Sequence, residues 1–175
     1  LDAAYRATRH MIEEGCKRIA HFAGPQNLLI GQLRKEGYLK ALREAGLETR
    51  KDWIFEADNF EKARLAVLNI LEEKTDIDGI FAVNDTTAIG AMHTLQKRGI
   101  KVPDQIAVVG FSDGRLSGIT DPALTSVDQH GYEMGTVATE ILLKRIMSSN
   151  KNYPFETRIL NADLIVRGSS VKEIS

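Results

Sequence analysis

Hydrophobic positions along this chain follow two alternating spacings. Segments with apolar residues three or four positions apart, typical of helices, are separated by short β-branched or aromatic runs, typical of strands. The helical segments lie near 2–14, 31–45, 60–73, 86–98 and 132–148, and the strand-like runs at 18–23, 53–57, 79–83, 106–111, 124–127 and 159–166. This alternation predicts an α/β fold, with helices on both faces of a doubly wound parallel sheet.

Two segments depart from the simple alternation. Residues 111–123 (FSDGRLSGITDPA) follow neither spacing and are rich in Gly, Ser and Asp, which indicates a functional loop or a long connection. The helical segment 132–148 spreads its apolar residues over a wider arc than one sheet face needs, namely Met134, Val137, Ala138, Ile141, Leu142, Leu143 and Ile146. We expect a partner or further apolar sequence to cover part of this helix.

The composition describes a globular chain with almost no net charge. Of its 175 residues, 43% are hydrophobic, and 23 Lys and Arg oppose 24 Asp and Glu, for a net charge of −1. These residues alone therefore lack the positive field that holds a protein on DNA. No apolar run approaches the roughly 20 residues that span a bilayer, and the first residues lack the apolar core of a signal peptide.

Cysteine usage points to a reducing compartment. The lone Cys16 cannot form an intramolecular disulfide, and no cluster of Cys and His offers a metal site. We therefore expect a cytoplasmic protein that holds no metal. Because the chain begins with Leu and opens into a helix without a preceding strand, we also expect it to be part of a longer protein.

Polar residues follow the strand-like runs, where an open doubly wound sheet binds its ligands. These residues are Gln26 and Asn27 with Arg34 on the helix that follows, then Asn84 and Asp85, then Ser112 and Asp113, and finally Gln129. Amides, carboxylates, a hydroxyl and a guanidinium can together hydrogen-bond a polyhydroxylated or heterocyclic ligand. The pattern thus predicts a binding site for a small polar molecule.

Five of these residues also have a structural explanation. Asp85 stands where a helix N-cap is expected, and Asn84 could close the turn before it. Ser112 and Asp113 are common turn residues, and Arg34 could lie on a solvated helix face. The sequence alone leaves both explanations open.

Catalysis finds little support in the sequence. None of the four histidines pairs with a Ser or Cys nucleophile motif, and the phosphate-binding patterns GxGxxG and GxxxxGK[ST] are both absent. We therefore expect no catalytic residues, no enzyme activity and no cofactor.

Five segments spread along nearly the whole chain carry a family resemblance. They are GCKRIAHFAGP, LRKEGYLKAL, IDGIFAVNDTTAIGAMHTLQKRGIKVPDQIAVVGFSD, DPALTSVDQ and LIVRGSS. In this order they resemble the effector-binding core of the LacI/GalR family of bacterial transcription regulators. The resemblance implies a periplasmic-binding-protein-like fold of type I, in which crossover strands join two α/β subdomains around a small ligand.

The resemblance also implies how the chain is divided. It assigns residues 1–128 and 158–170 to the C-terminal subdomain, and residues 130–157 to an excursion into the N-terminal subdomain. The DNA-binding head and most of the N-terminal subdomain would then lie outside this chain. The excursion would explain the wide apolar arc of the last helix.

Individual roles are implied as well. Arg34 matches a family arginine that donates to ligand oxygens, with a forked geometry that Lys cannot reproduce. Asn84 and Asp85 match an Asn-Asp pair in the cleft, and Gln129 matches a crossover glutamine. These four residues are the main candidates for ligand binding.

Two further positions match the family less closely. Ser112 stands where many members carry a carboxylate that accepts hydrogen bonds from sugar hydroxyls, and Asp113 follows it as a candidate replacement. Phe60 is the nearest candidate for an aromatic platform under the ligand. We include all three in the expected ligand-binding site.

The implied function is ligand-controlled transcription regulation. A sugar or sugar derivative would bind between the subdomains and shift a homodimer between states of different affinity for a DNA operator. Helix 86–98 and the loop at 115–119 are the candidate dimer contacts. The alternative is a periplasmic sugar receptor of a transporter, which upstream sequence would distinguish by a signal peptide in place of a helix-turn-helix. A third possibility, an enzyme on a flavodoxin-like sheet, would need a nucleophile or phosphate loop that the sequence lacks.

Overall fold

Six strands form one sheet in the computed structural model, which describes residues 1–148 and 153–172. The strands are β1 (Ile19–Ala23), β2 (Ile54–Glu56), β3 (Gly79–Ala82), β4 (Ala107–Ser112), β5 (Thr125–Asp128) and β6 (Asp163–Ile165). Their order is β2-β1-β3-β4-β5-β6. All neighbours from β2 to β5 are parallel, and β6 runs antiparallel to β5. The α/β fold is confirmed, and the parallel sheet gains one antiparallel edge strand.

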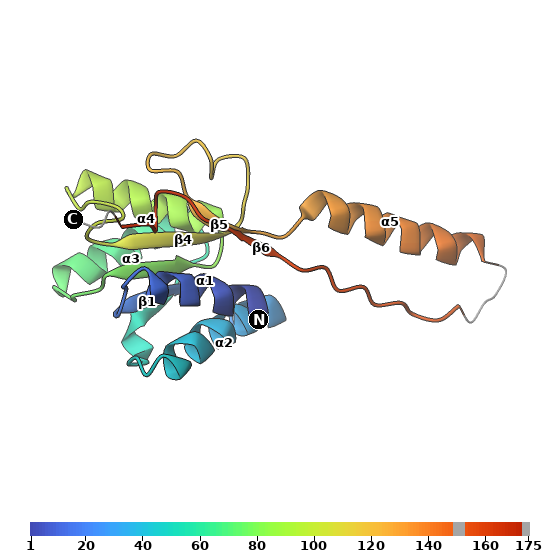
Figure 1. Cartoon of the computed structure of the whole chain (residues 1–175), viewed down its shortest axis with the longest axis horizontal. Coiled ribbons are helices and arrows are strands. Elements are labelled where there is room, and N and C mark those ends of the chain that lie inside the picture. Colours follow the sequence, from blue (N-terminus) through green and yellow to red (C-terminus); the bar gives the residue numbers. More distant parts are fainter. Residues whose placement is uncertain (149–152, 173–175) are drawn as a thin grey trace.

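Helices cover both faces of this sheet (Figure 1). They are α1 (Asp2–Glu13), α2 (Leu29–Glu44), α3 (Phe60–Glu72) and α4 (Asp85–Lys97), with a short 3₁₀ helix at Lys51–Trp53 before β2. Alternate strand residues point to opposite faces, so neighbours in β3 enter different cores. Phe81 packs with α1 and α2, whereas Ile80 packs with α3 and α4. Burial on both faces explains why the central strands are continuous apolar runs.

Helix α5 (Gly131–Met147) projects away from the sheet beyond the ends of β5 and β6 (Figure 1). None of its residues is buried, and Ile146 and Met147 are 68% and 82% exposed. The returning segment lies along it, since Arg158 and Leu160 line a hollow together with residues of α5. The wide apolar arc predicted for this helix is thus largely uncovered. What covers it in the complete protein stays a prediction.

The last predicted strand is shorter than expected. The apolar run at 159–166 forms a strand only at Asp163–Ile165, where it pairs with Ser126–Asp128 of β5. Residues 153–162 have no neighbouring strand, and a single extended segment without a partner cannot form a sheet ladder. Within the described ranges, no helix is long and apolar enough to cross a membrane.

Candidate ligand-binding site

The carboxyl ends of β1, β3, β4 and β5 meet at one edge of the sheet, and the chain leaves for α5 from the same edge (Figure 1). This common direction gathers residues that lie far apart in the sequence. Arg34 reaches the edge from α2, Ser112 ends β4, and Gln129 follows β5. The structure joins these three by hydrogen bonds.

The Arg34 side chain is buried at this edge, with 9% of the residue exposed. Its guanidinium carbon lies 3.9 Å from the centre of the Phe111 ring, and its Nη1 donates to the carbonyl of Val83. Its Nη2 lies 3.4 Å from Oε1 of Gln129. Burial lowers the pKa of Arg34 to about 10, so the side chain remains a cation at neutral pH. Arg34 is therefore not a solvated surface residue.

Gln129 connects Arg34 to the end of β4. Its Oε1 accepts from Arg34 and also lies 3.3 Å from the Ser112 hydroxyl. A guanidinium carries only donors, so the amide atom that faces it is the oxygen. The Gln129 amide nitrogen is consequently directed away from both partners. Ser112 has a φ of 119°, a backbone conformation that side-chain-bearing residues rarely adopt and that often marks a functional position.

The side chains of Asn84 and Asp85 form hydrogen bonds to other parts of the protein at this edge. The N-cap of α4 is Asn84, whose Oδ1 accepts from the Thr87 amide at 2.8 Å. Its Nδ2 also donates to the carbonyl of Asp58 at 2.9 Å. The sequence suggested Asp85 as the N-cap, and the structure places the cap one residue earlier, at Asn84.

Asp85 is an anchor for the loop at 111–123. The residue is 9% exposed, and its carboxylate accepts from the Gly114 amide at 2.7 Å and from the hydroxyls of Ser117 and Ser126 at 3.0 and 2.5 Å. These three hydrogen bonds tie the loop and β5 to the start of α4. Both carboxylate oxygens are occupied by protein donors.

The Asp113 carboxylate is also engaged within the protein. Its two oxygens accept from the Arg167 guanidinium at 2.6 and 3.1 Å, and Arg167 donates further to the carbonyl of Leu124 at 2.8 Å. The hydrogen bond with Asp113 raises the pKa of Arg167. Arg167 was not predicted as a site residue, because no spacing links it to a partner 54 positions away. Phe111, the ring beneath Arg34, was also missed, because it reads as an ordinary strand residue.

Residues 8–170 match the model of the periplasmic binding protein-like domain. The chain belongs to this family. It is 33% identical to the HTH-type transcriptional repressor PurR of Actinobacillus pleuropneumoniae serotype 3 (strain JL03). The matched region of 169 residues covers 96% of this chain and 50% of that relative. The chain spans about half the length of the curated relatives it matches.

Solved structures of transcription regulators share the fold of this periplasmic binding protein-like domain. The complex of the transcriptional regulator CelR with cellobiose has a TM-score of 0.86 at 31% identity, over 97% of this chain and 52% of that one. A LacI-family regulator from Sanguibacter keddieii has a TM-score of 0.87 at 30% identity, over 97% and 64% of the two chains. The resemblance to LacI-type regulators is confirmed.

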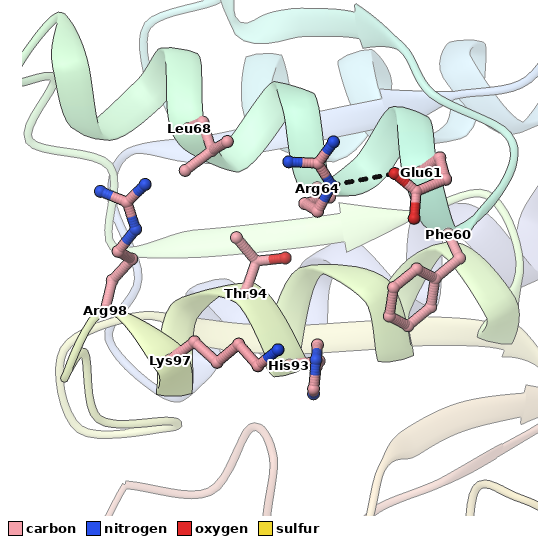
Figure 2. Close-up of a pocket in the computed structure, with 8 residues that line it drawn as sticks. All are labelled: Phe60, Glu61, Arg64, Leu68, His93, Thr94, Lys97 and Arg98. Atoms are coloured by element: carbon pink, nitrogen blue, oxygen red, sulfur yellow. Dashed lines mark hydrogen bonds and ion pairs between the residues drawn. The ribbon is translucent and has the colours of Figure 1, made fainter.

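Phe60 packs against His93 in this periplasmic binding protein-like domain. It begins α3, and its ring centre is 5.6 Å from that of His93 on α4. Figure 2 shows both rings in a groove between the two helices, with Arg64 paired to Glu61 at 2.9 Å and Lys97 further along. The groove follows the outer surface of α3 and α4. A role for Phe60 as a platform under the ligand stays a prediction.

His130 links the two crossings between the sheet and α5. It adopts a left-handed conformation, with a φ of 52°, at the N-cap of α5. Its ring Nε2 lies 2.8 Å from Oδ2 of Asp163 in β6, and its Nδ1 lies 3.3 Å from Oδ2 of Asp128 in β5. The hydrogen bond with Asp163 raises the pKa of His130. Neither these three side chains nor any other acidic, His or Cys side chains in the described part of the chain form a group of three or more suited to a metal ion.

We expect His130 to stabilise this junction in a pH-dependent way. Because its pKa is raised in the folded state, its contribution is present in full below the unfolded pKa of about 6.5 and is lost as the pH rises through the folded value. His130→Asn keeps a residue that tolerates the left-handed conformation and removes the titrating ring. The urea unfolding midpoint of the wild type should exceed that of the variant at pH 5.5, and the difference should shrink as the pH rises to 8. Parallel pH profiles for the two proteins would contradict this role.

Proposed function

We propose that this domain is the effector-binding part of a LacI-type transcription regulator and that it binds a sugar or sugar derivative at the carboxyl edge of its sheet. The observation that carries the proposal is the buried Arg34 guanidinium, stacked on Phe111 and linked to Gln129 at the strand ends. Burying a charged guanidinium carries a desolvation cost, and buried charges of this kind are common at functional sites. The site offers hydrogen-bonding groups without a nucleophile and base, which supports binding in place of catalysis.

The projection of α5 away from the sheet supports a site that a second subdomain completes. The chain leaves the sheet after β5 and re-enters it at β6, and α5 presents an uncovered apolar surface between these crossings. In the proposed protein, residues 1–128 and 158–170 form the C-terminal subdomain, and 130–157 pack into an N-terminal subdomain. A ligand held between them shifts the population of closed and open forms by its different affinity for each.

The proposed regulator acts on DNA in the cytoplasm through a head outside these residues. The names of the relatives, which are repressors and regulators, favour this function over a periplasmic sugar receptor. The near-neutral charge of this chain is compatible with it, because a basic head would carry the DNA contacts.

Ligand-dependent stabilisation of the whole encoded protein tests the proposal. A ligand present at 100 times its Kd should stabilise the native state by about 2.7 kcal/mol, which raises the melting temperature measurably. We would screen neutral sugars, sugar acids, sugar phosphates and nucleobases by thermal shift. Stabilisation by one of the sugar classes is the expected result, and a flat response to every compound would overturn the proposal.

The same proposal includes a homodimer with a contact on α4 and the adjacent loop. Leu116 and Ile119 are 59% and 76% exposed in that loop, which Asp85 fixes beside the start of α4. Ile119→Glu should weaken the dimer about tenfold or more, because it places a charge where an apolar contact is expected. Sedimentation equilibrium of the whole protein measures the change. Ile30→Glu on α2, across the sheet and 52% exposed in the wild type, is the matched control and should leave the dimer intact.

A further inference from the structure

We propose that the effector is an anion, a small molecule that presents a carboxylate or phosphate group to Arg34. This inference rests on the proposed function, in which a ligand occupies the edge of the sheet beside Arg34 and Gln129. It adds the chemical class of that ligand. Three observations on the described residues carry it.

The first observation is an excess of hydrogen-bond donors. A guanidinium carries more N–H groups than the two hydrogen bonds of Arg34 use. The Oε1 of Gln129 accepts from both Arg34 and Ser112, which leaves its amide nitrogen as a further donor. Two neighbouring side chains therefore present donors to whatever binds beside them.

The second observation is that the nearby carboxylates are already occupied. Asp85 accepts three hydrogen bonds from the loop and β5, and Asp113 is paired with Arg167. The last residue of β4 is Ser112, which carries a hydroxyl and no charge. A neutral sugar must donate its hydroxyl protons as well as accept, and the carboxylates of Asp85 and Asp113 are already engaged by protein donors. An oxyanion only accepts, so it matches the donors that are present.

The third observation is a buried positive charge without an ion pair. Within the described part of the chain, Arg34 contacts a carbonyl, an amide and an aromatic ring, and no carboxylate forms an ion pair with it. Burial disfavours its charged form, as the lowered pKa indicates, and Asp85 opposes this effect only from a distance. An anionic ligand would supply the missing counter-charge and could form two parallel hydrogen bonds with the guanidinium.

Matched ligands test the inference on the whole encoded protein. Glucose, gluconate and glucose 6-phosphate form one series, and the corresponding compounds of galactose and ribose form two more. Calorimetric titration should show that one anionic member binds about tenfold or more tightly than its neutral parent, a difference of about 1.4 kcal/mol. The sugar acid and the sugar phosphate distinguish the two sources of negative charge.

The possible results separate this inference from the function on which it rests. Tighter binding of a neutral sugar than of its anionic derivatives would overturn the anion inference and leave the proposed function intact. Failure of all nine compounds, together with a flat thermal-shift screen, would overturn the proposed function itself.

Introducing a carboxylate at the end of β4 gives a second, independent test. Ser112 is exposed and lies 3.3 Å from Gln129 Oε1, so Ser112→Asp introduces a negative charge beside the proposed anion site. We expect the preference for the anion over its neutral parent to fall about tenfold or more. Ser112→Asn is the matched control, because an Asn side chain has nearly the same size as Asp and carries no charge. An unchanged preference in Ser112→Asp, or an equal loss in both variants, would contradict the charge argument, and circular dichroism would confirm that each variant is folded.

Discussion

Replacing Asp85 with Ala should lower the free energy of unfolding by about 3–5 kcal/mol, because a buried acceptor shared by three protein donors is removed. The donors are the Gly114 amide and the hydroxyls of Ser117 and Ser126. Ser117 and Ser126 are fully buried, so leaving either hydroxyl without an acceptor carries its own desolvation cost. The loop at 111–123 would also lose its attachment to the start of α4.

Urea unfolding followed by circular dichroism measures the loss, and limited proteolysis of the loop reports the local effect. Asp85→Asn retains one acceptor oxygen and should cost less than Asp85→Ala. Asp104→Ala, at an exposed carboxylate, is the matched control and should change stability by no more than about 0.5 kcal/mol. A loss below about 1 kcal/mol in Asp85→Ala would show that the anchor is not the main attachment of the loop.

The fold was largely predictable because burial on both faces leaves a direct record in the sequence. A strand such as β3 (GIFA) is apolar throughout, since Ile80 and Phe81 enter opposite cores. The exception is the last strand, where an apolar run from 159 to 166 yields only Asp163–Ile165. Apolar residues at 159–162 lie beyond the reach of β5, and hydrophobic spacing carries no information on whether a neighbouring strand is present.

The site was only partly predictable, because the sequence indicates which residues lie close together but not which groups each of them binds. Strand direction placed Arg34, Ser112 and Gln129 at one edge, and the structure joins them. The role of a carboxylate depends on which donors reach it. Asp113 was a candidate acceptor for the ligand, and Arg167, brought next to it by the return from α5, occupies that carboxylate.

Replacing Arg34 with Ala should weaken effector binding by about 100-fold, or about 2.7 kcal/mol, in the whole protein. The side chain supplies the only guanidinium of the Arg34, Ser112 and Gln129 cluster, together with the orientation of Gln129. Arg34→Lys keeps the charge and loses the planar fork, so we expect an intermediate loss of about tenfold. The protein should remain folded in both variants, because no ion pair within the described residues depends on this buried cation.

Calorimetric titration with the ligand identified in the thermal-shift screen measures both losses. Lys35→Ala removes the same charge from the neighbouring position of α2 and should leave affinity nearly unchanged, which separates a local contact from the general field of the protein. An equal loss in Lys35→Ala would assign the effect to long-range electrostatics. Unchanged affinity in a folded Arg34→Ala variant would remove Arg34 from the site, since a guanidinium that contacts the ligand cannot be deleted without cost to binding.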